Sequence, residues 1–232
     1  MKLAQWLLCV TAMVFTWVCD VQADAGSARP VTFKQASDSW KKEGLQPVKA
    51  PGLDLLFVRK DARLDGYSKV LLKQPMIEVN PDWRRKSGMG VSTTPVKVQP
   101  VIDQIGAMLQ GEVQKALSEG GYELVQAPGD GVVEVELAIL NLFLIATENA
   151  VKRGDGMDGR SVGRMTLVAN LRDSRSGELI LRTFDDEVGP KPERLMRDAV
   201  AECMNWARSV MAGWTGALRG GLDISTGRKS AG

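Results

Sequence analysis

Hydrophobic residues recur every three or four positions in two long segments of the chain. In the first, residues 98–117, the apolar stripe has the 3.6-residue period of a helix and stops at glycines 120–121. In the second, residues 195–218, the stripe includes Cys203 and stops at glycines 220–221. The pattern predicts two long amphipathic helices, with Cys203 on the buried face of the second.

Strands are predicted at residues 67–79, 132–146, 162–173 and 179–188. Residues 132–138 and 162–173 alternate apolar and polar side chains, as strands with one buried face do. The short turn at residues 173–178 requires antiparallel pairing of its two strands. Pro75 predicts an edge position or a bulge in residues 67–79, because proline cannot donate a ladder hydrogen bond. The order of elements predicts an α+β fold: a two-layer, mostly antiparallel sheet with two long amphipathic helices on one face.

The N-terminal residues have the three-part pattern of a secretory signal peptide. Lys2 precedes an apolar run over residues 3–19, and Val21 and Ala23 offer small side chains to a signal peptidase. We therefore predict a signal peptide at residues 1–23, the alternative being an uncleaved N-terminal anchor.

The remainder of the chain is expected to form an extended lead-in at 24–50, a single α+β domain at 51–219 and a flexible C-terminal tail at 220–232. Cys9 and Cys19 each follow a bulky residue, so the lipid-attachment pattern of lipoproteins is missing. The expected location is periplasmic or secreted, without a transmembrane helix after signal cleavage.

Composition narrows the chemistry that we expect. The chain has no histidine and a formal net charge of +2 over 232 residues. Without histidine, Ser-His-Asp and Cys-His catalysis and histidine-based metal sites are excluded. Charges of both signs are interspersed, so no nucleic-acid partner is expected. We also expect no cofactor and no bound metal.

A glycine-rich segment, residues 154–159, satisfies the pattern G-x-G-x-x-G. That pattern binds a dinucleotide only where a strand leads into a helix, and here a strand is expected to follow. Asp155 and Asp158 would also repel phosphate, and with Glu148 they are too few for a calcium site. We interpret this segment as a solvated loop.

Four strand and turn segments occur in a characteristic order and spacing. They are Tyr67-Ser68-Lys69-Val70-Leu71-Leu72, Ile77-Glu78-Val79, Gly121-Tyr122-Glu123-Leu124-Val125 and Asp173-Ser174-Arg175-Ser176-Gly177-Glu178. Over roughly residues 50–215 the chain thereby resembles a family of bacterial envelope proteins, many of them lipoproteins, named domain of unknown function thirty-three thirteen. The resemblance implies an envelope location and an α+β fold. It implies no catalytic residues, because the family has no established activity.

The candidate binding surface is a basic loop formed by Trp83, Arg84, Arg85 and Lys86. An aromatic residue beside three positive charges suits an anionic lipid or glycan head group, and long loops of compact domains often carry function. The alternative is a solvated loop held down by its tryptophan.

The candidate catalytic cluster is Asp185, Asp186 and Glu187. Paired carboxylates hydrolyse glycosidic bonds, but neighbouring residues of a strand point to opposite faces. The sequence therefore favours a non-catalytic exported cell-envelope protein, a binding or accessory module for an envelope protein or glycolipid partner. The alternative is a histidine-free, carboxylate-dependent hydrolase that acts on an envelope glycan.

Overall fold

The computed structural model describes residues 33–50, 52–60, 62, 65–81, 95–144, 161–190 and 199–226. Within them, eight strands form one sheet of order β1-β2-β8-β7-β6-β3-β5, and β4 also pairs with β6. The strands are β1 (Leu45–Val48), β2 (Leu55–Arg59), β3 (Lys69–Leu72), β4 (Met76–Val79), β5 (Glu123–Leu124), β6 (Val132–Leu144), β7 (Gly163–Asp173) and β8 (Leu179–Val188). The pairs β1–β2, β2–β8, β8–β7 and β7–β6 are antiparallel, whereas the pairs β3–β5, β3–β6 and β4–β6 are parallel. The predicted α+β class with a mostly antiparallel sheet is confirmed.

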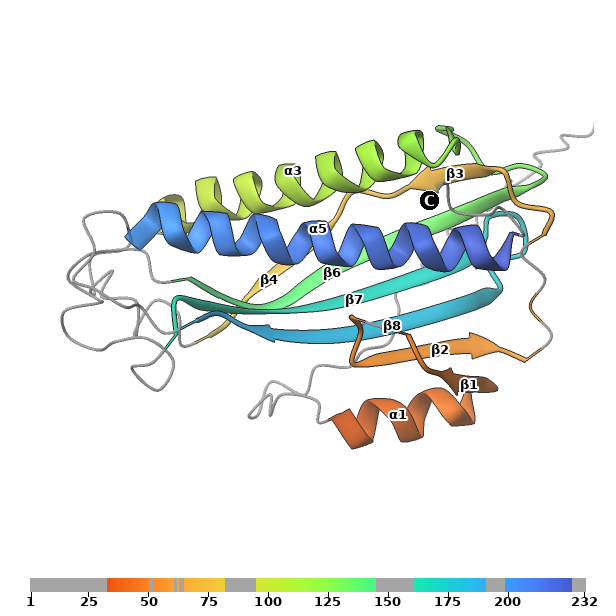
Figure 1. The fold of residues 1–232 in the computed structure, drawn as a ribbon, viewed down its shortest axis with the longest axis horizontal. Helices are drawn as coiled ribbons and strands as arrows, with labels where there is room; N and C mark the ends of the chain where they lie inside the picture. Colours follow the sequence, from red (N-terminus) through yellow and green to blue (C-terminus); the bar gives the residue numbers. More distant parts are fainter. Residues whose placement is uncertain are drawn as a thin grey trace, which may run out of the picture.

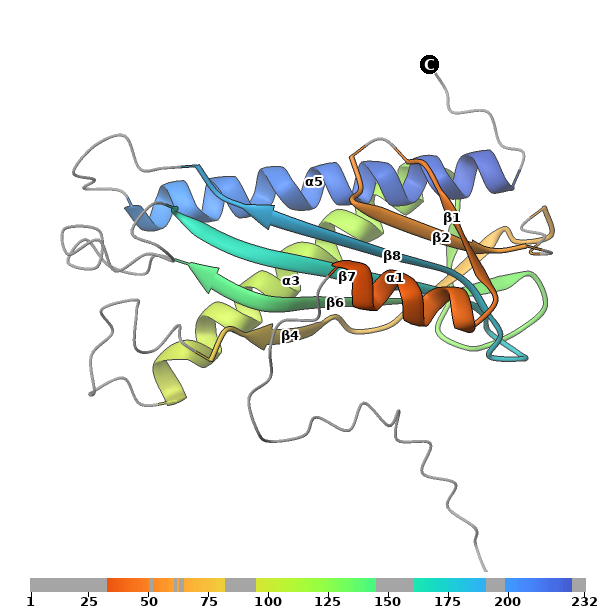
Figure 2. The ribbon, with the colours of Figure 1, turned by 90° about the horizontal axis from the view of Figure 1, so that it is seen from below.

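Three helices pack around this sheet in the described part of the chain: α1 (Phe33–Lys42), α3 (Pro95–Glu119) and α5 (Ala199–Ser225). In Figure 1, α3 and α5 run along one side of the sheet and α1 lies on the other. Figure 2 agrees, with α1 in front of the strands and α3 behind them.

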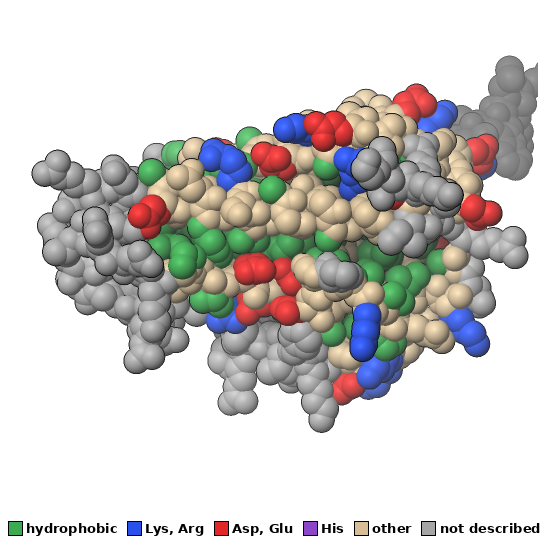
Figure 3. All heavy atoms as spheres, viewed as in Figure 1, with side chains coloured by type: hydrophobic (Ala, Val, Ile, Leu, Met, Phe, Trp, Pro, Cys, Tyr) green, Lys and Arg blue, Asp and Glu red, His purple; other side chains and the backbone are tan. Residues whose placement is uncertain are grey.

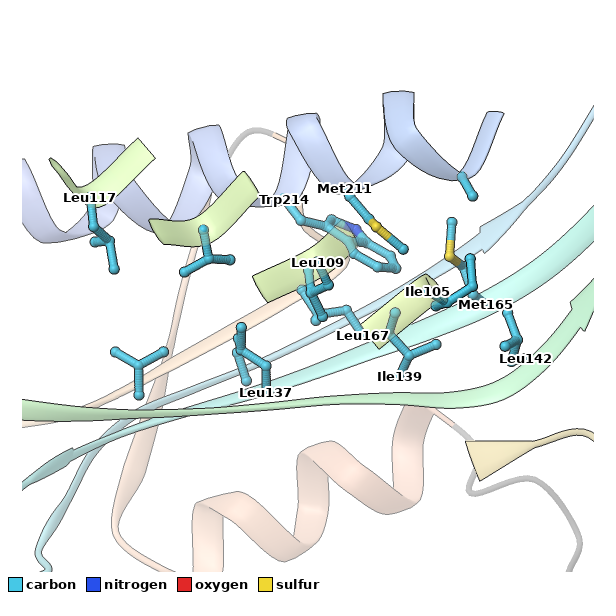
Figure 4. Close-up of a cluster of buried hydrophobic side chains, with 14 of the residues drawn as sticks. Ile105, Leu109, Leu117, Leu137, Ile139, Leu142, Met165, Leu167, Met211 and Trp214 are labelled. Atoms are coloured by element: carbon cyan, nitrogen blue, oxygen red, sulfur yellow. The ribbon is translucent and has the colours of Figure 1, made fainter. Parts of the chain in front are cut away.

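The main hydrophobic core lies between the sheet and the two long helices. Figure 4 shows Leu109 of α3 and Trp214 of α5 meeting Leu167 of β7. Cys203 is 2% exposed, and its thiol donates to the carbonyl oxygen of Val162 at 3.0 Å. The predicted burial of Cys203 is confirmed, so the apolar stripe of the second helix has the expected phase.

Strand β6 lies inside the sheet, between β7 and the parallel pair β3 and β4. Its buried side chains alternate as far as Ile139, and an irregularity at Asn141, whose φ is +56°, then shifts the register. Beyond it Leu142, Phe143 and Leu144 are all buried. This strand is therefore central in the sheet, and its C-terminal part is covered on both faces.

The segment expected as an extended lead-in instead contains α1 and β1. Trp40 and Leu45 pack with Phe57 and Leu179 in a second, smaller core. The Trp40 and Phe57 rings meet edge to face at 5.3 Å, and the guanidinium of Arg182 stacks over Trp40. Residues 33–48 contain too few apolar side chains to form a stable helix and strand by themselves. Packing against Phe57 and Leu179 therefore stabilises α1 and β1.

Two further elements differ from the expectation. Helix α5 continues through glycines 220–221 to Ser225, so residues 220–225 are not a flexible tail. Leu222 and Asp223 are buried there, and the Tyr122 hydroxyl donates to Asp223 at 3.0 Å; these tertiary contacts outweigh the low helix propensity of glycine. Residues 67–79 form two strands, β3 and β4, with Pro75 in the break between them.

The turn between β7 and β8 is fixed by Asp173. Its Oδ1 accepts backbone hydrogen bonds from Ser176 at 2.7 Å and Arg175 at 3.1 Å. The Ser176 hydrogen bond is the main reason why the pKa of Asp173 falls to about 2. Burial and a hydrogen bond to Asp173 raise the pKa of Tyr67 to about 12. The turn segment at residues 173–178 therefore has a structural role: it closes the predicted hairpin between β7 and β8.

Candidate functional site

The basic loop that the sequence singles out, Trp83, Arg84, Arg85 and Lys86, lies outside the described residues. So do residues 145–160, which include the glycine-rich segment, and residues 1–23. The geometry of a site therefore comes from the sheet and from α5.

A pocket of about 490 Å³ lies between the C-terminal half of α5 and the sheet. Its volume falls within the range of about 300–1,000 Å³ that is typical of small-molecule sites. Most of its wall is aliphatic: Val48, Ala50, Leu53, Leu56, Val58, Leu109, Val113, Leu137, Leu167, Ala169, Leu171, Leu181, Ala217, Leu218 and Leu222. Figure 3 shows a band of hydrophobic side chains along this side of the molecule, between α5 and the strands. The surface can thus receive an apolar group.

Small residues of α5 keep this pocket hollow. Ala217, Gly220 and Gly221 contribute to the wall, and a Cβ atom added at Gly221 would meet no atom within 4 Å. Trp214 and Leu218 line the pocket one or two turns earlier, so Gly221 lies on the same helical face. From the sequence, glycines 220–221 predicted only a helix stop; in the structure they lie inside a continuous helix and line the pocket.

The polar side chains of the wall are Lys49, Thr183 and Thr215. Thr183 donates its hydroxyl to the carbonyl of Leu55 at 2.7 Å, and Thr215 donates to that of Ala212 at 3.1 Å. Their donors are therefore occupied within the protein. Lys49, which is exposed on the connection between β1 and β2, is the one charged residue in the described lining.

Asp185 fixes Trp214, which forms part of the wall. The indole Nε1–H donates to Asp185 Oδ2 at 2.6 Å, and the backbone N–H of Asp54 donates to Asp185 Oδ1 at 2.8 Å. Asp185 is 4% exposed, and burial raises the pKa of its carboxyl, against the opposing effect of the Trp214 hydrogen bond. Both carboxylate oxygens therefore serve to join β8, α5 and the start of β2.

Asp186 points to the other face of the sheet, as expected for adjacent strand residues. Its carboxylate accepts hydrogen bonds from Arg164 and from the Thr166 hydroxyl, the latter at 2.7 Å. Burial, followed by the charge of Asp185, raises the pKa of Glu187. The structure therefore does not bring Asp185 and Asp186 together on one surface.

Within the described residues, no group of three or more cysteine, aspartate or glutamate side chains is arranged to hold a metal ion. No helix in the same part of the chain is long and apolar enough to cross a membrane.

The sequence matches no family model, and no curated protein matches it. Similar solved structures include a Xanthomonas campestris protein of family DUF330, with 13% identity, a TM-score of 0.43 and coverage of 75% of this chain and 94% of that chain.

Two further similar structures are the PelC dodecamer from Paraburkholderia phytofirmans and a minor lipoprotein from Acinetobacter baumannii. PelC is 13% identical over 73% of this chain and 96% of its own, with a TM-score of 0.33. The lipoprotein is 12% identical over 69% of this chain and 93% of its own, with a TM-score of 0.34. Because every one of these TM-scores lies below 0.5, we draw no functional argument from them.

Proposed function

We propose that this chain is a non-catalytic, exported binding module of the cell envelope, and that its pocket beside α5 receives an apolar ligand. The observation that carries the proposal is the cavity of about 490 Å³ with an almost wholly aliphatic wall. Ligand sites are concave and mostly apolar, with a few polar groups that set orientation. A core without a ligand would instead pack to close contact, since protein interiors have few voids larger than a water molecule.

Export is the part of this proposal that rests on the sequence. The signal-peptide pattern at residues 1–23 supports it, with cleavage after Ala23 and no lipid on Cys19. Membership of the envelope family named thirty-three thirteen belongs to the same proposal. N-terminal sequencing and intact-mass measurement of the exported protein test the cleavage after Ala23. An acylated chain that begins at Cys19 would contradict this cleavage.

The carboxylate-dependent hydrolase has less support. A glycosidase needs two carboxyl groups that flank the same bond. Asp185 and Asp186 point to opposite faces, and hydrogen bonds inside the protein engage both of them. No other observation favours this alternative.

The basic loop of Trp83, Arg84, Arg85 and Lys86 remains a proposed contact for an envelope protein or glycolipid partner. Changing Arg84, Arg85 and Lys86 together to serine should weaken recovery of that partner from envelope extract and leave the melting temperature nearly unchanged. A large drop in the melting temperature would instead show that these residues are structural.

The pocket is tested with an uncharged fluorescent probe, N-phenyl-1-naphthylamine, whose emission rises in apolar surroundings. We expect saturable binding to the mature wild-type chain. Gly221→Leu should abolish this binding, because the new side chain enters open space on the pocket face of α5.

The matched control is Gly216→Leu. Gly216 lies on the same helix, is exposed, does not line the pocket, and also has open space around an added Cβ. This variant should bind the probe like the wild type. A wild-type chain without saturable binding would contradict the proposal, as would equal binding by the wild type and Gly221→Leu.

A further inference from the structure

We propose that the ligand of this pocket is an amphiphile with one aliphatic chain and an anionic head group, which pairs with Lys49. This inference rests on the proposed function and adds the chemical class of the ligand. It follows from the residues that line the pocket: most have aliphatic side chains, and Lys49 is the single cation in the described lining.

The interior of the pocket favours a hydrocarbon chain over a polar ring or a peptide. The threonine hydroxyls of its wall already donate to backbone carbonyls, at 2.7 Å for Thr183 and 3.1 Å for Thr215. A buried carbonyl oxygen of a ligand would therefore find no free hydroxyl donor among these threonines in place of its hydrogen bonds to water, which is unfavourable. Methylene groups carry no such penalty, and burial of each one contributes favourably.

The space for the chain follows α5. The lining residues of this helix run from Trp214 to Leu222, about 12 Å at the rise of an α-helix. Along this stretch the small residues Ala217 and Gly221 leave space beside the helix, and Leu171 and Leu181 of the sheet line the same pocket. One flexible chain can adapt to such an irregular space.

Lys49 supplies the charge complementarity. The β1–β2 register pairs Val48 with Leu56, so Lys49 and Ala50 continue beyond the strand end and line the pocket. Lys49 is exposed, and no described carboxylate lies within ion-pair distance of its ammonium group. A charge at a solvated rim beside an apolar cavity suits an amphiphile whose head group stays in water.

Acidic groups near the pocket are engaged elsewhere. Asp185 accepts hydrogen bonds from Trp214 and from the backbone of Asp54. Asp54 in turn accepts from the backbone N–H of Asp186 at 3.0 Å. None of these carboxylates lines the cavity. The experiment also includes a cationic amphiphile, which tests whether the pocket prefers a negative or a positive head group.

The experiment measures displacement of N-phenyl-1-naphthylamine by dodecanoate, dodecyltrimethylammonium and dodecyl maltoside, each below its micelle concentration. Dodecanoate should displace the probe from the wild type at the lowest concentration. Lys49→Met should weaken dodecanoate about threefold and Lys49→Glu about tenfold, as expected for an exposed ion pair and its reversal. Probe affinity should stay unchanged, and the differences should shrink in high salt.

The matched control is Lys42→Glu, which makes the same charge change on α1, across the sheet from the pocket. It should leave displacement by dodecanoate as in the wild type. If Lys42→Glu and Lys49→Glu act equally, or if the cationic amphiphile displaces the probe best, the inference is wrong. In either case probe binding itself, and its loss in Gly221→Leu, still supports the proposed function.

Two other possible occupants of the pocket, the C-terminal segment of this chain and a second copy of it, would each give a different experimental result. If removal of residues 227–232 increases probe binding, the C-terminal segment of this chain fills the pocket and the inference is overturned. If the wild type is a dimer and Gly221→Leu is a monomer, a second copy occupies it, with the same consequence. If the probe does not bind the wild type at all, the proposed function fails together with the inference.

Discussion

The two ends of α5 meet the sheet in opposite ways. At the N-terminal end, a Cβ atom added to Gly163 would lie 2.7 Å from the Trp206 ring and 2.8 Å from the carbonyl oxygen of Phe143. At the C-terminal end, a Cβ atom added to Gly221 would meet nothing within 4 Å. One glycine lets two elements approach closely, whereas the other leaves a space unfilled.

The difference teaches how the pocket persists. The open part of α5 is held by polar contacts on each side of it: Trp214 donates to Asp185, and Tyr122 donates to Asp223. Arg219 also pairs with Asp223 at 3.5 Å within the helix. These hydrogen bonds hold the C-terminal part of α5 at a set distance from the sheet. The pocket can therefore persist without close packing of side chains between them.

The largest effect is expected at the closely packed end. Gly163→Ala should lower the free energy of unfolding by about 3 kcal/mol, because the added methyl group collides with Trp206 and with the backbone of Phe143. Denaturant unfolding measures this loss. Gly213→Ala is the control, since Gly213 is exposed on α5 and an added Cβ there meets open space. A loss below about 1 kcal/mol for Gly163→Ala would show that this end is not closely packed.

The next effect is expected at the hydrogen bond that borders the pocket. Trp214→Phe should lower the free energy of unfolding by about 2 kcal/mol at neutral pH, because a buried carboxylate oxygen of Asp185 loses its donor. Unfolding of the variant and the wild type is compared at pH 5 and pH 8.

The sign of the pH dependence follows from the raised pKa of Asp185. The folded state holds this proton more tightly than the unfolded state, so stability rises as the pH falls through the folded pKa toward the lower pKa of the unfolded state. Loss of the Trp214 hydrogen bond raises this pKa further, and the deficit of Trp214→Phe should therefore be smaller at pH 5 than at pH 8. In an Asp185→Asn background this pH difference should vanish. A deficit that grows on acidification would show that Asp185 does not cause it.

Much of the sheet and the phase of both long helices could be predicted from the sequence. Alternation identified β6 and β7, the short turn after β7 identified β8, and the helical period placed Cys203 on the buried face, because these patterns are local. Helix α1 was missed because Trp40 is buried by Phe57 and Leu179, which lie far along the chain. No local pattern contains such partners.

The pocket could not be predicted for a related reason. Its volume belongs to the space that α5, α3 and five strands enclose, and no single segment shows it. The one local signal, glycines 220–221, is typical of a helix end, whereas the burial of Leu222 and Asp223 and the hydrogen bond from Tyr122 favour a continuous helix there. The divergence of Asp185 and Asp186, in contrast, followed directly from the two-residue period of a strand.

The smallest effect is expected at the open end, and it has the opposite sign. Gly221→Ala should raise the free energy of unfolding by about 0.5–1 kcal/mol, because alanine favours the helical backbone and its methyl group enters unoccupied space. Gly216→Ala should give a similar gain on the solvent side of α5, so equal gains would show that the pocket side is as unobstructed as the surface. A loss of stability in Gly221→Ala alone would mean that the helix lies close to the sheet there. In that case the contrast between the two ends of α5, and the pocket with it, would not hold.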